Sequence, residues 1–481
     1  ADPSPEFLAA SLLQTPPVFL SARRAETKWR SLPEDLAWLE KQNLRLRNPR
    51  EVGWDRLFAT LLFSDCNTLP IFRQHSEFLQ NACPELLRTE VKIPSRLFIP
   101  RPRRLRLGVA LNRCSDGLTS SAVSRLFRQL DRDRFETVLF FPDNSPANES
   151  FASMLAAVDE SHAVPSALDR EEWRETNLVA ARAGLDLLLH ENWGIYSFIS
   201  FSRLAPVQCS FFDTCISIAA PAEDYVVLAG KPDWLADWKS WYAEKIVLLD
   251  NFVGGWGKPG PDEPEAVHLE EFGLPSTAKL MFTWHDPRRW DPGDDALLAK
   301  LLSDNPAAWL LVAASHHPPT VRQGLAIRWR LSLAAAYERI KFIPFQPPGR
   351  FLGLLRRADL VLTPPVAGTM STGTALGQGV SLVVRDGQSP NIKINTLAYE
   401  ILGVEGLIAR SPEEWLALNQ RLLDDRDWRR KKGEEIRANY PKLHDQAAAV
   451  RDLENFLEAA YERARNGLPP AAWSGGRFLD G

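Results

Sequence analysis

Short apolar runs alternate with helical segments along two stretches of this 481-residue chain, and this alternation most constrains its fold. In the first stretch the predicted strands are 105–111, 137–142, 185–190, 225–228 and 245–249. In the second they are 279–283, 309–313, 340–343, 359–362, 381–384 and 407–409. Strands separated by helices form parallel sheets with helices on both faces. The sequence therefore predicts an α/β protein built from two Rossmann-like units.

Changes in pattern divide the chain into four predicted parts. Residues 8–100 carry only helical spacings and predict an all-α domain. The Gly/Pro-dense segment Gly254–Pro261 separates a first Rossmann-like domain, 101–255, from a second one, 256–444. A closing amphipathic helix, 445–466, is expected to pack back on the first domain. Because such folds bind ligands at the carboxyl ends of strands, substrate is expected in the cleft between the two domains.

Composition excludes several classes of partner. The net charge is −4, so no basic surface is expected to attract nucleic acid. No apolar run reaches the roughly 20 residues of a membrane-spanning helix. The five cysteines are an odd number without metal-ligand spacing, which is typical of reduced thiols in a cytoplasmic protein. The sequence gives no reason to expect a cofactor.

A hydroxyl-rich segment, Gly368–Thr374, lies between the predicted strands 359–362 and 381–384. Where a helix begins after a strand, its first N–H groups and neighbouring hydroxyls can bind a phosphate. Small residues such as Gly368 and Gly373 let the phosphate approach the backbone. The segment therefore predicts an anion site. An ordinary strand–loop–helix connection is the alternative interpretation.

Several motifs resemble those of glycosyltransferase family 41, which includes O-linked N-acetylglucosamine transferases, SPINDLY-type proteins and bacterial adhesin N-glucosyltransferases. Arg203-Leu-Ala-Pro-Val-Gln208, followed by Asp224-Tyr225, is similar to the family's Arg-x-Ala-Pro-x-Gln…Asp-Tyr pattern. The segments that resemble the family's C-terminal half, in order, are 340–344, 358–362, 368–372, 379–383 and 402–409. The resemblance spans about residues 105–465 and implies a glycosyltransferase B fold. Because no tetratricopeptide period precedes residue 100, it favours the bacterial N-glucosyltransferase-like branch.

The resemblance also implies a donor site. It gives Ser371, Thr372 and the backbone of Thr369 to Gly373 as diphosphate ligands, and it places Arg289 where the family has a lysine. An arginine can grip phosphate with two N–H groups. The other residues implied or considered as donor contacts are Thr283, His285, Arg288, Gln346 at the uracil position, Gly368, and Thr374 in place of an acidic ribose contact.

Other interpretations of these donor-site residues stay open. Arg288 and Arg289 could be a surface pair at a helix start, and His285 could be a packing residue. His316 and His317 follow the predicted strand 309–313, and as adjacent loop residues they point in different directions.

The candidate general bases are carboxylates. The family's first-domain histidine has no counterpart in 112–120, where Asp116 is the nearby carboxylate. The family's Gly-[His/Tyr]-Pro element is replaced by Asp213-Thr-Cys215, which makes Asp213 the second candidate. Both could instead be solvated loop or helix-cap residues. Arg289 is expected to stabilise the departing diphosphate.

These motifs predict a cytoplasmic protein glycosyltransferase. It would move a hexose or N-acetylhexosamine from UDP to Ser, Thr or Asn of a polypeptide. No Asp-x-Asp motif lies at an expected cleft position, which suggests a metal-independent reaction, and the resemblance suggests inversion. The alternatives are a non-protein acceptor, a catalytically silent partner or subunit, and a sugar-nucleotide epimerase. The helical N-terminal domain is expected to recruit the acceptor or to form a dimer or complex.

Overall fold

The structure is a computed structural model that describes most of residues 3–479. The residues outside the description are 1–2, 53, 89–103, 113–116, 146, 167–171, 192–197, 212–215, 254–262, 314–317, 365, 445 and 480–481, and at 54–56, 117–122, 172 and 370 only the backbone is described. The predicted domain boundary Gly254–Pro261 therefore lies outside the described residues, as do Cys114 and Cys215. The three described cysteines form no disulfide.

The first part of the chain is helical, as predicted. Its helices are α1 (Pro5–Leu13), α2 (Ala22–Lys41), α3 (Trp54–Leu62) and α4 (Leu69–Ala82), with 3₁₀ turns at Pro49–Val52 and Pro84–Leu87. Apolar residues spaced along one face of α2, Leu32, Leu36 and Leu39, are fully buried. They share a core with Phe198 and Phe201 of the following α/β unit, so the helical part is packed against that unit.

A nine-stranded sheet forms the next unit, in the order β15-β14-β7-β6-β5-β4-β1-β2-β3. Its strands are parallel except for the β14–β15 pair. The strands are β1 (Leu105–Ala110), β2 (Phe135–Pro142), β3 (Glu160–Val164), β4 (Leu187–His190), β5 (Val207–Ser210), β6 (Tyr225–Ala229), β7 (Lys245–Leu249), β14 (Trp473–Ser474) and β15 (Arg477–Phe478). The accompanying helices are α5 (Gly117–Gln129), α6 (Glu149–Leu155), α7 (Glu172–Arg182) and α8 (Trp234–Trp238).

All five strands predicted for this unit are confirmed, and four strands were missed. The edge strand β3 contains Glu160, Ser161 and His162, and β5 buries Gln208 and Ser210, so neither has the sequence of an apolar run. The C-terminal strands β14 and β15 have two residues each.

A second α/β unit follows, with the four-stranded parallel sheet β10-β9-β8-β11 and the parallel pair β12–β13. A parallel bridge between Val361 and Leu382 brings the segment before β12 beside β11. The strands are β8 (Lys279–Thr283), β9 (Ala308–Ala313), β10 (Ile340–Ile343), β11 (Leu360–Val361), β12 (Val384–Arg385) and β13 (Ile408–Ala409). The helices are α9 (Asp295–Asp304), α10 (Pro319–Ser332), α11 (Pro348–Arg357), α12 (Thr369–Gly377), α13 (Pro390–Leu402), α14 (Pro412–Asp424), α15 (Arg426–Asn439) and α16 (Pro441–His444).

Each run predicted as a strand in this unit contributes to the sheets, although the runs at 359–362 and 381–384 are trimmed or shifted.

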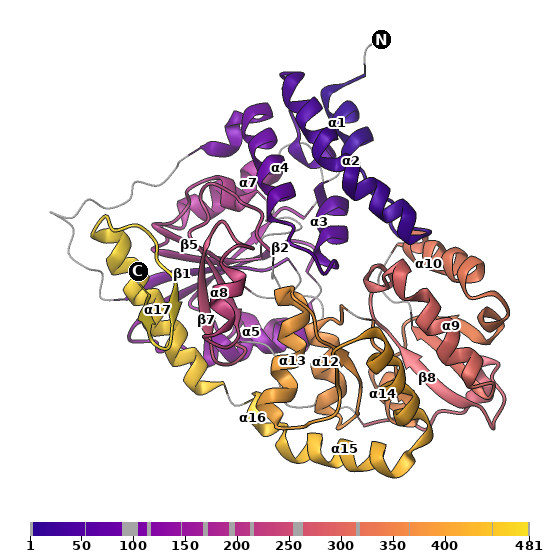
Figure 1. Cartoon of the computed structure of the whole chain (residues 1–481). Helices are drawn as coiled ribbons and strands as arrows, with labels where there is room; N and C mark the ends of the chain where they lie inside the picture. The colour runs from indigo at the N-terminus through magenta and orange to yellow at the C-terminus, as the bar shows by residue number, and fades with distance from the viewer. Residues whose placement is uncertain are drawn as a thin grey trace.

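The last helix, α17 (Ala447–Arg465), lies along the nine-stranded sheet rather than the second unit (Figure 1). Its Val450, Leu453 and Phe456 share a core with β1, β4 and β7. Arg134, just before β2, bonds Glu458 on this helix at 2.7 Å. These contacts hold α17 against the nine-stranded sheet. The predicted division of the chain into domains, including the closing helix 445–466, stays a prediction.

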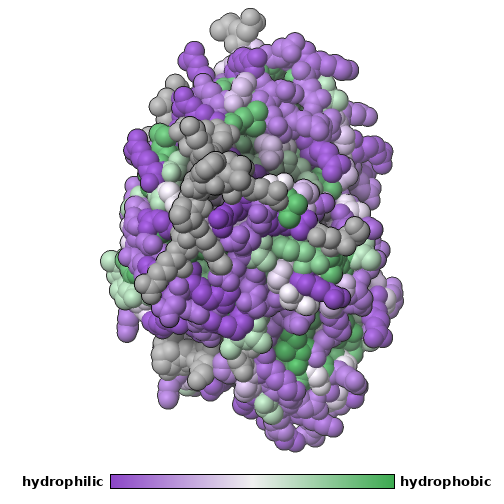
Figure 2. Space-filling view, turned by 90° about the vertical axis from the view of Figure 1, so that its left-hand side faces the viewer, coloured by the Kyte–Doolittle hydropathy of each residue, from purple (hydrophilic) through white to green (hydrophobic). Residues whose placement is uncertain are grey.

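Hydrophilic residues predominate on the face of the molecule that looks left in Figure 1, as Figure 2 shows. None of the described helices has the length and apolar character needed to cross a membrane.

Candidate functional site

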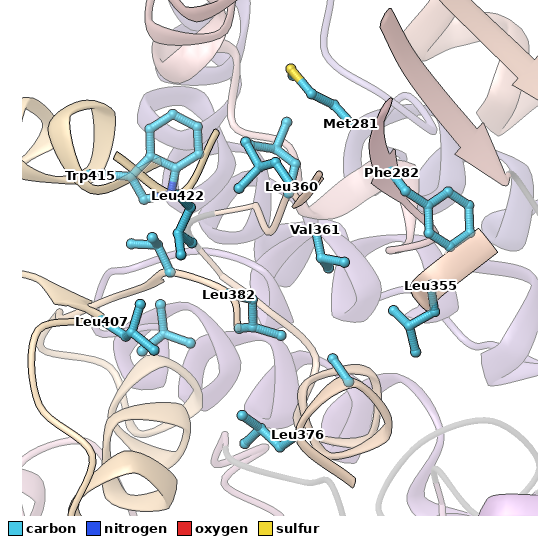
Figure 3. Packing of buried hydrophobic residues seen from close by; sticks show 14 of the residues in the cluster. Met281, Phe282, Leu355, Leu360, Val361, Leu376, Leu382, Leu407, Trp415 and Leu422 are labelled. Carbon is cyan, nitrogen blue, oxygen red and sulfur yellow. The ribbon is translucent and has the colours of Figure 1, made fainter. Parts of the chain in front are cut away.

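Helix α12 starts at the carboxyl end of β11, the position at which parallel sheets bind ligands. Its buried end is fixed by Leu376, which lies in one apolar cluster with Val361, Leu382 and Leu355 (Figure 3). Because this end is anchored in the core, the helix N-terminus at Thr369 is held at the end of the sheet.

The first amides of α12 are available to an anion. Gly368 occupies the N-cap position, and no side chain caps the helix within the described chain. The amide of Thr372 donates to the Gly368 carbonyl at 2.9 Å, so the helical ladder begins there. The N–H groups of Thr369, Met370 and Ser371 precede that ladder and have no acceptor inside the helix. The predicted set of backbone donors, Thr369 to Gly373, is therefore too large, because the amides from Thr372 onward are bonded inside the helix.

Buried polar atoms gather beside this helix start. The Thr372 hydroxyl is fully buried and has no hydrogen-bond partner among the described residues. Asn395 of α13 donates to the Ala367 carbonyl at 2.9 Å, whereas its buried Oδ1 accepts from no described group. An unsatisfied buried polar atom costs about 1–3 kcal/mol, so such atoms indicate a place where a ligand or water can bind. Asn395 was not predicted, because nothing in the spacing of α13 places it next to residue 367.

Arg289 lies directly against the loop that leads into α12. A Cβ atom added to Gly368 would stand 3.3 Å from the Arg289 guanidinium carbon, so glycine permits this close approach. Arg289 Nη1 also donates to the Val366 carbonyl at 3.3 Å. The Arg289 guanidinium thus lies beside the segment that carries the uncapped amides, so two kinds of group that bind phosphate are close together.

Arg288, next to Arg289, is engaged differently. Its Nε and Nη2 donate to the Asp286 carboxylate at 2.6–3.0 Å. The Asp286 side chain also accepts from the Arg288 amide at 2.9 Å, as the N-cap of the turn Pro287–Arg289. The two arginines that the sequence analysis considers as a pair therefore have different hydrogen-bond partners.

His285 follows β8 and is almost completely buried. Its ring stacks on Trp284 with centroids 5.2 Å apart, and its Nδ1 lies 3.3 Å from the Thr283 hydroxyl. Burial first, and then the nearby Arg289 charge, lowers its pKa to about 3. The imidazole is consequently neutral near pH 7, and its buried Nε2 has no partner among the described residues. Thr283 and His285 are brought together, and His285 is close enough to Arg289 for their charges to interact.

Of the remaining predicted donor residues, Gln346 lies across the sheet from α12, whereas Ser371 and Thr374 lie on α12. Gln346 bonds within its own loop, donating to Pro344 O at 2.9 Å and accepting from Arg350 at 3.4 Å. It follows β10, three strand spacings from β11. At about 4.8 Å per spacing, that is roughly 14 Å from the helix α12 side of the sheet. Ser371 and Thr374 are half-buried on α12 itself.

The predicted bases Asp116 and Asp213 lie outside the described residues, as do His316 and His317. The predicted cleft between the two α/β units stays a prediction for the same reason. Near α12, Tyr440 donates to Gly373 O at 3.4 Å, and the charge of Arg125 on α5 of the first unit acts on the Tyr440 hydroxyl. Burial raises the pKa of Tyr440 to about 12, and the Arg125 charge opposes that rise.

The Arg-x-Ala-Pro-x-Gln segment forms a polar cluster in the first unit. Arg203 binds both oxygens of Asp224, at 2.5 and 3.0 Å. Gln208 Oε1 accepts from the backbone N–H groups of Leu204 and Ala205, and the backbone N–H of Gln208 donates to Asp224 Oδ2 at 2.9 Å. These residues join β5 to the start of β6, so the motif that carries the resemblance supports the fold here.

Comparison with solved structures identifies the class of fold. A mutant of the O-GlcNAc transferase of Thermobaculum terrenum matches with a TM-score of 0.71 and 20% identity, covering 93% of this chain and 83% of that chain. A sucrose-phosphate synthase from Thermosynechococcus elongatus matches with a TM-score of 0.50 and 14% identity, covering 75% of this chain and all of that one. The predicted fold is confirmed: the chain has a glycosyltransferase B fold preceded by helices.

Sequence comparisons add no family. No protein-family model matches the chain. A search of curated proteins also finds no match. The resemblance to glycosyltransferase family 41 therefore stays a prediction at the level of sequence.

Proposed function

We propose that this protein is a glycosyltransferase that uses a nucleotide sugar as donor. The observation that carries the proposal is the start of α12, where three uncapped amides lie beside the Arg289 guanidinium at the carboxyl end of a parallel sheet. Negative charge develops on a diphosphate as it leaves a sugar, and N–H donors together with a fixed positive charge stabilise it. The fold shared with a protein named as an O-GlcNAc transferase supports this assignment.

The finer parts of the proposal follow the motifs. The donor is a UDP-linked hexose or N-acetylhexosamine, and the acceptor is Ser, Thr or Asn of a polypeptide. Transfer inverts the anomeric centre without a metal ion, and Asp116 or Asp213 serves as the base. In this proposal the neutral His285 offers its Nε2 as a hydrogen-bonding group rather than as a titrating base, because its pKa is lowered to about 3.

Titration calorimetry with UDP, UDP-glucose, UDP-N-acetylglucosamine and GDP-fucose tests donor binding. The purified chain should bind at least one UDP compound. Arg289→Ala should weaken that binding roughly 10- to 100-fold, since a charge-assisted contact contributes about 1.5–3 kcal/mol. Failure of every nucleotide to bind the wild-type chain would refute the proposal.

Arg288→Ala is the matched control for this measurement. It removes an adjacent guanidinium whose charge is already compensated by Asp286, so UDP affinity should change less than about threefold. Equal losses in the two variants would show that general positive charge, rather than the Arg289 position, holds the nucleotide. Binding followed by transfer of radiolabelled sugar to a peptide library then identifies the acceptor. Binding without transfer to any acceptor would favour the silent partner.

A further inference from the structure

A short segment of the N-terminal helical part, Leu62–Asp65, reaches the candidate donor site. It begins with Leu62, the last residue of α3. The Phe63 ring centroid lies 4.2 Å from the Arg289 guanidinium carbon and 5.5 Å from that of Arg288. An aromatic ring from the first 65 residues of the chain therefore contacts the cation that the proposed function places on the diphosphate.

Residues on both sides of Phe63 hold it in place. Asp65 accepts from the amides of Gln388 and Ser389 at 3.1 and 2.9 Å, at the start of α13. Asn391 of the same helix donates to the Leu62 carbonyl at 2.7 Å. A carboxylate at a helix N-terminus is also favoured by the helix dipole. Phe63 is thus fixed between two bonded neighbours.

The cavity beside Phe63 is too small for a nucleotide. It has a volume of about 50 Å³, and the residues that line it include Phe63, Trp29, Arg288 and Trp290. That volume suits one or two water molecules. The ring therefore acts on the site through the arginine it touches.

We infer that Phe63 is a positioning residue for Arg289, so that the N-terminal helices complete the donor site. This inference rests on the proposed function. An arginine side chain loses rotamer entropy when it is held in one conformation, and ordering it before a ligand binds removes that cost from binding. A guanidinium stacks on an aromatic face and is more weakly hydrated than an ammonium. The ring thus provides a physical reason for arginine at a position where the resemblance leads one to expect lysine.

A double-mutant cycle read by UDP calorimetry tests the inference. Phe63→Leu removes the aromatic face while keeping apolar volume, and should weaken UDP binding roughly 3- to 30-fold. Phe63→Tyr keeps the face and should restore affinity to within about twofold of wild type. In an Arg289→Ala background, Phe63→Leu should cost less than about twofold, because the group it positions is gone.

Trp428→Leu is the matched control. It removes an aromatic contact of similar length, 4.1 Å from the Arg421 guanidinium, between α14 and α15. It should leave UDP affinity unchanged, and thermal unfolding of every variant checks the fold.

The outcomes separate the two proposals. Wild-type UDP binding that Phe63→Leu leaves intact, or weakens equally without Arg289, would overturn the positioning role alone. In the second case the ring contacts the ligand itself or supports the fold. Absence of nucleotide binding by the wild-type chain would overturn the proposed function and this inference with it.

Discussion

Two arginines, Arg203 in the first α/β unit and Arg289 in the second, are held in different ways. Arg203 binds a carboxylate through two hydrogen bonds, and the same carboxylate accepts a backbone amide. Arg289 donates to a carbonyl and lies against an aromatic ring, beside a glycine and an uncapped helix start. The first arrangement neutralises the charge inside the protein. The second holds the charge in place next to groups that bind anions.

The difference separates a structural use of arginine from a ligand-binding use. Both residues lie in segments that resemble the same family. Sequence similarity alone therefore does not distinguish the structural arginine from the ligand-binding one. In the first unit burial raises the pKa of Asp224 and Arg203 opposes that rise, so each partner depends on the other. Mutations should therefore affect stability at one site and nucleotide affinity at the other.

The largest expected effect is that of Arg203→Ala on stability. Removal of the guanidinium leaves the mostly buried Asp224 carboxylate uncompensated, which should lower the free energy of unfolding by about 3–5 kcal/mol. Urea denaturation measures this loss. Arg289→Ala should change the unfolding free energy by less than about 1 kcal/mol. Similar losses in the two variants would remove the distinction between the sites.

A second effect concerns acid stability and His285. Its folded pKa of about 3 lies below the unfolded value near 6.5, so the unfolded chain takes up the proton first as pH falls. Its contribution to stability is complete above pH 6.5 and is lost as the pH falls toward 3. By pH 5 the loss should reach roughly 2 kcal/mol. Urea denaturation at several pH values should show a smaller loss in His285→Asn.

His75, in the helical part, provides the control for this prediction. Burial alone lowers its pKa to about 3, whereas at His285 the Arg289 charge adds to burial. Arg289→Ala should therefore raise the pKa of His285 and leave His75 unchanged, as followed by NMR titration of the two rings. Equal shifts at both histidines would contradict the described proximity of Arg289 and His285.

The smallest effect is expected from Thr372→Val. This change removes a buried hydroxyl without a described partner, so the ligand-free protein should be as stable as wild type or more stable by about 1 kcal/mol. If the hydroxyl meets the donor, UDP affinity should fall roughly 3- to 10-fold. Calorimetry and urea denaturation give the two values.

Thr363→Val is the matched control. The Thr363 hydroxyl donates to the Val383 carbonyl, so its loss should destabilise the protein by about 1 kcal/mol and leave UDP affinity unchanged. A destabilised Thr372→Val protein with normal UDP affinity would instead make Thr372 a core residue.

Much of the candidate site could be predicted, and the limits have physical causes. The hydroxyl-rich segment was proposed because a strand followed by small residues and a helix start is a local pattern. Arg289 was proposed only through the resemblance to a family. Phe63 and Asn395 were missed, since they reach the site from distant segments of the chain. The extent of the backbone donors was overestimated, because the first turn of α12 begins at Thr369 and uses the later amides itself.

The sequence by itself determined the alternation of buried strands and helices, and hence two α/β units with mainly parallel strands, because side-chain periodicity is read within a few residues. Only the tertiary structure decided which arginine is neutralised and which lies beside the uncapped amides, and which strand completes each sheet edge. Those outcomes depend on contacts between segments that are far apart along the chain. Such contacts form when buried polar groups must find partners during packing, and no local pattern records them.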